Sequence, residues 1–161
     1  MPEFRDRSRT SVLRRSAVVL IVSLLAAPAA QAESFTFKTT GKNIDRVQLP
    51  AATQGGRPSG AGVSAVETDT TYPDGKVLHS SGKCASWILP PDAQFGSNQV
   101  CTYTGPGGDA YQVNLTCEAP PQGPNCWGKL VGTGGRFKGR TGAFTLQSGQ
   151  NGSTGAGLWN D

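Results

Sequence analysis

Strict alternation of apolar and polar side chains constrains this chain more than any other feature. Residues 111–117 read Tyr-Gln-Val-Asn-Leu-Thr-Cys, and residues 34–39 alternate in the same way. Successive side chains of a β-strand point to opposite faces, so a period of two indicates strands with one buried face. Runs with helical spacing are missing, and 22 glycines punctuate the chain. The sequence therefore predicts an all-β protein.

Turn signals separate the expected strands. Tyr72-Pro73-Asp74-Gly75 has Pro and Gly at favoured β-turn positions, and residues 105–108, Gly-Pro-Gly-Gly, are expected to close a hairpin. Residues 42–60 and 119–125 are expected to form longer loops that can rim a pocket. Eight or nine short antiparallel strands at this spacing predict one small barrel or sandwich. The expected strands are 34–39, 62–71, 76–80, 84–89, 99–104, 111–117, 126–131, 143–147 and 156–159.

The first 32 residues have the pattern of an export signal. Five arginines precede the apolar run 17–27, and Ala30-Gln31-Ala32 forms a small-x-small cleavage site. The apolar run is shorter than the roughly 18 to 20 residues that cross a bilayer core, which argues against a retained membrane anchor. We therefore expect a signal peptide over 1–32, a single domain over 33–161, and a periplasmic or extracellular location.

Charge argues against a nucleic-acid partner. Residues 1–32 hold 5 of the 15 lysines and arginines and 2 of the 11 acidic residues, so 33–161 carry 10 basic and 9 acidic side chains. The resulting net charge of +1 does not provide the basic surface that nucleic-acid binding requires.

The cysteines predict two disulfides. All four follow the expected cleavage site, and an even number of cysteines in an oxidising compartment is typical of a disulfide framework. A zinc site is disfavoured, because there is no Cys-x-x-Cys pair and the one histidine lies outside the cysteine spacings. No metal or other cofactor is expected. Of the three pairings that remain open, Cys84–Cys101 with Cys117–Cys126 is favoured because each would join strands adjacent in sequence.

Residues 131–142, Val-Gly-Thr-Gly-Gly-Arg-Phe-Lys-Gly-Arg-Thr-Gly, resemble the glycine-rich signature of bacterial proteins related to the allene oxide cyclase and dirigent barrels. Residues 100–104 and 107–109 resemble that group's cysteine-bearing strand and hairpin turn, and 155–159 resemble its last strand. The resemblance implies an eight-stranded barrel, often with an apolar cavity. Relatives of this kind often form dimers or trimers, so a homo-oligomer is a further expectation.

The glycine-rich motif also has a physical interpretation as a sharp strand corner. Its glycines supply backbone freedom, and Phe137 is expected to pack inward as a plug. A phosphate-binding loop over 134–141 is the alternative, but a strand-like segment follows it where such a loop needs a helix. The residues assigned to the structural turn are Gly132, Gly134, Gly135, Phe137, Gly139 and Gly142.

Glu67, Asp69 and His79 are the candidate acid/base residues. Glu67 and Asp69 share the face of their expected strand with Val63, and this parity favours the barrel interior. Paired carboxylates and a histidine there can transfer protons, whereas on the outer face they are ordinary solvated charges.

Aromatic side chains are the candidate ligand-binding residues. Tyr103 and Tyr111 flank the turn at 105–108, and Trp87 and Trp127 are expected to face a common interior. Asn114 is added to this set as a polar contact, and core packing is the alternative for the aromatic residues.

Three functions remain open from the sequence. The first is an exported barrel that binds a small, largely apolar or aromatic molecule. The second, implied by the resemblance, is a cofactor-free isomerase, cyclase or lyase whose pocket holds a reactive substrate in one conformation. The third is an envelope or extracellular interaction module whose core is filled by Phe137, Leu115 and the tryptophans.

Overall fold

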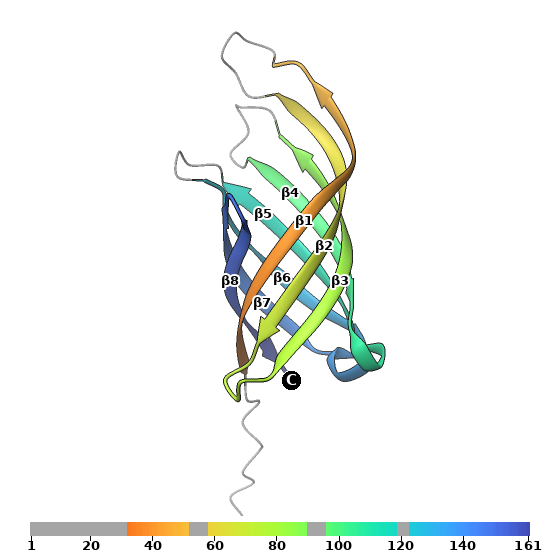
Figure 1. Cartoon of the computed structure of the whole chain (residues 1–161), viewed down its shortest axis with the longest axis vertical. Helices are drawn as coiled ribbons and strands as arrows, with labels where there is room; N and C mark the ends of the chain where they lie inside the picture. The colour runs from red at the N-terminus through yellow and green to blue at the C-terminus, as the bar shows by residue number, and fades with distance from the viewer. Residues whose placement is uncertain (1–31, 52–57, 90–95, 119–122) are drawn as a thin grey trace, which may run out of the picture.

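The computed structural model describes residues 32–51, 58–89, 96–118 and 123–161, which form a closed barrel of eight antiparallel strands (Figure 1). Each strand pairs with the next along the chain, and β8 pairs with β1 to close the barrel. The all-β barrel expected from the sequence is therefore confirmed. The strands are β1 (Glu33–Leu49), β2 (Ser59–Thr71), β3 (Val77–Ile88), β4 (Ser97–Thr104), β5 (Ala110–Glu118), β6 (Asn125–Gly134), β7 (Thr141–Gly149) and β8 (Gly152–Asn160).

Helical structure in the described part of the chain is limited to two single turns, η1 (Pro106–Gly108) and η2 (Gly135–Phe137). No helix there is long and apolar enough to cross a membrane. Apart from its last residue, the predicted signal peptide lies outside the described residues.

Two sequence predictions about strands are wrong in detail. The segments 76–80 and 84–89 belong to one continuous strand, β3, and β1 runs to Leu49 through residues expected to be a loop. In β1 the register against β2 shifts between Asn43 and Asp45. An irregularity of this kind moves the side chains of a strand by one position, so the alternation that marks a strand in the sequence is lost there.

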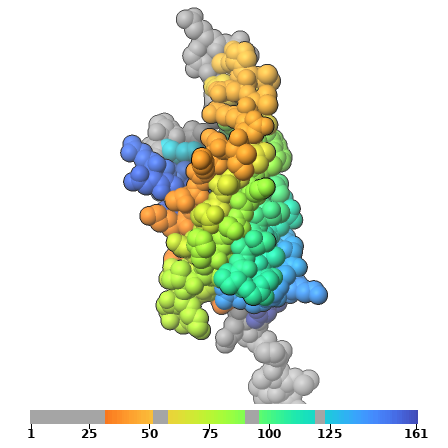
Figure 2. Space-filling model, turned by 45° about the vertical axis from the view of Figure 1, so that its right-hand side comes forward, coloured from red at the N-terminus to blue at the C-terminus, as the bar shows by residue number. Residues whose placement is uncertain are grey.

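The second half of β1 projects beyond the barrel together with the start of β2 (Figures 1 and 2). The pairing of β1 with β8 ends at Thr39, whereas its pairing with β2 continues to Leu49. Ile44, Val47 and Leu49 on this projection are exposed.

Glycines on the inner face make room for the aromatic core. A Cβ atom on Gly155 would lie 2.5 Å from the Phe37 ring, and one on Gly157 would lie 2.5 Å from the Phe35 ring. Both glycines belong to β8, which pairs with β1 at these positions. The Phe35 and Phe37 rings therefore occupy the space beside these two glycines, which a larger residue at either position would fill.

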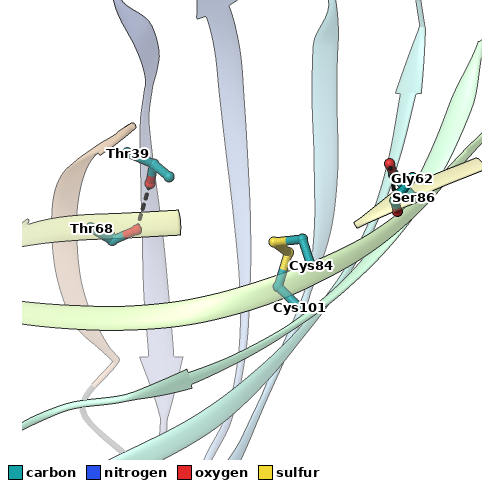
Figure 3. The surroundings of a disulfide bond; sticks show 6 residues. All are labelled: Thr39, Gly62, Thr68, Cys84, Ser86 and Cys101. Atoms are coloured by element: carbon teal, nitrogen blue, oxygen red, sulfur yellow. Dashed lines mark hydrogen bonds between the residues drawn. A yellow bond between two sulfur atoms is a disulfide. The ribbon is translucent and has the colours of Figure 1, made fainter. Parts of the chain in front are cut away.

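Both disulfides join neighbouring strands and face the interior. Cys84 on β3 bonds to Cys101 on β4, and Cys117 on β5 bonds to Cys126 on β6, as favoured from the sequence. In each case the two residues are direct cross-strand partners with Cα atoms 4.0 Å apart. Figure 3 shows the first disulfide, which bridges the two strands at a buried position.

The glycine-rich motif forms the β6–β7 corner and not a phosphate-binding loop, since β7 follows it directly. The corner folds back on Gly132, whose amide donates to the Arg140 carbonyl over 2.8 Å. A Cβ on Gly132 would overlap the Phe137 carbonyl oxygen, and Gly139 has a φ of 82°. Phe137 itself is 1% exposed, so its predicted inward packing is confirmed.

Candidate ligand-binding site

The barrel encloses a cavity of about 380 Å³. This volume is within the range of small-molecule sites in proteins, roughly 300 to 1,000 Å³. All eight strands contribute inward-facing side chains to it, as the alternation of buried and exposed positions requires. The interior is therefore partly filled and partly hollow.

A continuous group of aromatic rings forms one end of the cavity, next to the β2–β3, β4–β5 and β6–β7 connections. Phe137 and Trp159 stack with their centroids 4.6 Å apart, and Tyr111 contacts both rings edge-on. Contacts then continue from Trp159 through Phe35 and Phe37. We call this group the aromatic floor; its members are Phe35, Phe37, Tyr72, Tyr103, Tyr111, Phe137, Phe144 and Trp159.

The tyrosines of the floor are neutral hydrogen-bonding groups. Burial raises the pKa of Tyr103, Tyr111 and Tyr72 above the ordinary value. For Tyr103, hydrogen bonding to Thr68 opposes this increase in pKa. The Tyr72 hydroxyl is buried without a hydrogen-bond partner, an arrangement that usually carries a free-energy cost.

Small uncharged polar side chains line the opposite half of the cavity. The Thr39 and Thr68 hydroxyls hydrogen-bond over 2.7 Å across β1 and β2 (Figure 3), and those of Ser148 and Ser153 over 2.9 Å across β7 and β8. We call this group the polar mouth; its members are Thr39, Asn43, Ser64, Thr68, Ser86, Ser97, Gln99, Ser148 and Ser153. Most are half-buried, so a bound molecule would meet them between the floor and the solvent.

The predicted acid/base residues come together, but on the outside of the barrel. His79 Nδ1 lies 2.8 Å from Asp69 Oδ1, and His79 Nε2 lies 3.1 Å from Glu67 Oε2. All three side chains are more than half exposed, and none lines the cavity. The hydrogen bond that His79 Nδ1 donates to the Asp69 carboxylate is the main cause that raises the pKa of His79. The expectation that Glu67 and Asp69 face the interior is therefore wrong.

The position of this trio follows from the cost of burying charge. Along β2 the threonines at 68 and 70 alternate with Glu67 and Asp69, and only one set can face inward. A hydroxyl is far cheaper to bury than a carboxylate, so the threonines take the inner face. Among the described residues, no group of three or more His, Cys, Asp or Glu side chains is arranged to hold a metal ion.

Two of the five predicted ligand-binding residues, Tyr103 and Tyr111, line the cavity. Trp87 and Trp127 are each 40% exposed on the outer face, so their expected inward position is wrong. Asn114 is exposed as well and does not line the cavity. The disulfides explain the orientation of the tryptophans. Cys84 and Cys126 point inward, and residues at odd spacings from them on the same strand must point outward.

Sequence reasoning missed most of the aromatic floor and polar mouth. Phe35 and Phe37 were part of a recognised alternating strand, and Trp159 lay in an expected strand, yet none was assigned to a site. The inward direction of Cys84 is the signal that would have placed Ser86 inside, because Ser86 lies two residues along the same strand and shares its face. Thr39 shares the parity of Phe35 and Phe37, so the alternation of residues 34–39 would have placed it inside. Ser153 lies before the expected strand 156–159 and carries no comparable signal, since serine is common on both faces of a strand.

Arg140 and Arg136 lie beyond the aromatic floor, at the end of the barrel away from the polar mouth. Arg140 Nη1 lies 2.7 Å from Glu33 Oε2, and its guanidinium lies 5.9 Å from the centre of the Trp159 ring. Arg136 Nε lies 3.1 Å from Asp109 Oδ2, and its guanidinium covers the Phe137 ring. Both cations are thus paired with carboxylates and stacked on aromatic rings.

No protein-family model matches this chain, and no curated protein sequence is significantly similar to it. The fold and the residues of the cavity therefore carry the functional argument.

Proposed function

We propose that this protein is an exported barrel that binds a small, largely apolar or aromatic molecule in its interior. The observation that carries this proposal is the cavity of about 380 Å³ between the aromatic floor and the polar mouth. A concave, mostly apolar site with a few convergent polar groups is the usual form of a small-molecule site. The resemblance of residues 131–142 to barrels that often hold an apolar cavity supports the same proposal.

Binding is favoured over catalysis by the position of the candidate proton-transfer groups. Glu67, Asp69 and His79 contact each other on the outer face and not the cavity. A general acid or base must lie within hydrogen-bond distance of the reacting atoms or reach them through one water. A shaped pocket that only holds its ligand needs no such group.

A hollow interior also argues against a module with a filled core. Phe137, Leu115 and Trp159 pack inside as that alternative requires, but Trp87 and Trp127 lie outside and leave part of the interior unfilled. Export is supported by two interior disulfides, since such bonds persist in oxidising compartments.

Native mass spectrometry of the exported protein, with both disulfides formed, tests the proposal. We expect a bound species whose extra mass disappears on denaturation. Ser86→Trp should abolish it by filling the cavity, because Ser86 faces inward on β3. Ala85→Trp is the matched control, since it places the same side chain on the outer face of the same strand. Absence of any adduct, together with no binding of apolar probes from solution, would overturn the proposal.

A further inference from the structure

We infer that the ligand is electrically neutral over the part that the barrel encloses. This inference rests on the proposed function and narrows the ligand class. The ligand would be an uncharged molecule with an apolar or aromatic body and neutral hydrogen-bonding groups such as hydroxyls, carbonyls or amides.

The composition of the cavity wall is the first observation. Among the described residues that line it, none is Asp, Glu, Lys, Arg or His. Its polar groups are the hydroxyls of serine, threonine and tyrosine and the amides of Asn43 and Gln99. Each of these groups can donate or accept a hydrogen bond without supplying a formal charge.

The charged residues of the strands are exposed, except Glu33 at the start of β1, which pairs with Arg140 beyond the aromatic floor. Lys38, Lys83 and Lys129 lie in the middle of β1, β3 and β6, and all three are exposed on the outer face. The arginines nearest the floor are engaged with Asp109 and Glu33, and the rings of Phe137 and Trp159 separate them from the cavity side of the floor. The described residues therefore offer no free counter-charge to a molecule inside the barrel.

Electrostatics then decides the ligand class. A charge moved from water into an apolar site without a partner loses several kcal/mol of hydration that neutral dipoles only partly replace. The buried tyrosines do not change this, because their hydroxyls remain protonated at neutral pH. A neutral ligand escapes this cost and still satisfies the hydroxyls and amides of the polar mouth.

Two fluorescent probes that differ by one charged group provide the test. N-phenylnaphthylamine is neutral, and anilinonaphthalene sulfonate has the same ring system with an added sulfonate. Only the fluorescence change that Ser86→Trp removes and Ala85→Trp retains is counted, so that binding outside the cavity does not contribute. We expect the neutral probe to bind at least about tenfold more tightly than the anionic probe, which corresponds to about 1.4 kcal/mol or more.

A charge placed in the mouth should weaken or abolish this preference. Gln99→Lys puts a flexible ammonium group on the half-buried inner face of β4, near solvent, where it should raise the affinity of the sulfonate probe about tenfold. Gln112→Lys makes the same change on the outer face of β5 and should have little effect.

The outcomes separate the two proposals. Equal cavity binding of both probes, or tighter binding of the anion to the unmodified protein, overturns neutrality and leaves the binding function intact. Failure of both probes to bind, with no adduct in native mass spectrometry, overturns the binding function and the neutrality inference with it.

Discussion

Tyr103 and Tyr111 are direct cross-strand partners on β4 and β5, and their rings stack 4.9 Å apart at an interplanar angle of 12°. Both rings are buried in the aromatic floor, as is Tyr72, and the chain has no other tyrosine. The inner face of the barrel thus holds every phenol that the sequence provides.

This burial predicts an unusual alkaline titration. The pKa of each tyrosine is raised by burial, so the folded barrel should form little phenolate as pH rises past the ordinary value of 10.0. When the pKa of a group is higher in the folded state, its contribution to stability is complete at pH values below the unfolded-state pKa. This contribution is lost as pH rises from the unfolded-state pKa toward the folded-state pKa. We therefore expect stability to fall above about pH 10, with the tyrosines ionising as the barrel unfolds. Phenolate absorbance recorded with circular dichroism measures both events, and gradual ionisation near pH 10 in a folded barrel would contradict the prediction.

Gly157→Ala should destabilise the barrel by about 1–3 kcal/mol, the usual cost of overpacking a core. The added methyl would lie 2.5 Å from the Phe35 ring and 2.7 Å from the Ala143 carbonyl oxygen. Urea unfolding measures the loss. Gly149→Ala is the matched control, because its methyl would meet nothing closer than 3.7 Å and its effect should stay within about 0.5 kcal/mol. Equal stability of the two variants would show that the contact at Gly157 is not tight.

Each disulfide should stabilise the barrel mainly by limiting the freedom of the unfolded chain. Cys84–Cys101 spans 17 residues and Cys117–Cys126 spans 9, so loop-closure entropy predicts contributions of about 3 and about 2.5 kcal/mol. Replacing each pair by alanines and measuring urea unfolding under oxidising conditions tests this. A variant that lacks one disulfide and unfolds at the same urea concentration as the unmodified protein would contradict the prediction for that bond.

The outer trio predicts a raised pKa for His79. In the folded protein Asp69 and then Glu67 favour the imidazolium, so the pKa should exceed the ordinary 6.5. The resulting stabilisation is present below pH 6.5 and is lost as pH rises through the folded-state pKa. An NMR titration of the ring protons measures this pKa directly. Asp69→Asn should lower it more than Glu67→Gln does, and a pKa at or below 6.5 in the unmodified protein would show that the ion pairs do not persist in solution.

The strands were largely predictable, because period-two alternation is a local property. Each strand segment expected from the sequence falls within one of the eight strands or within a residue of its ends. The failure at residues 42–49 has a local cause as well, since the register shift after Asn43 removes the alternation that identifies a strand.

Whether a side chain faced the interior was harder to predict, because alternation gives two faces without saying which one is buried. For β2 the parity of Val63 pointed the wrong way, and the low cost of burying Thr68 in place of Glu67 would have given the correct face. The orientation of Trp87 follows from that of Cys84, which lies three residues away on the same strand and points to the opposite face. This relation became usable only when the structure placed the disulfide inside the barrel.

By itself the sequence determined the all-β class, the turns and the favoured cysteine pairing, because these depend on neighbours along the chain or across one hairpin. Only the tertiary structure decided that β8 closes on β1, and this closure brings Phe35 to Trp159 and leaves a hollow lined by uncharged groups. Closure joins the first and last strands, which are far apart in the sequence. The space left inside depends on how side chains from all eight strands pack together. A pattern within one segment of the sequence cannot determine this packing.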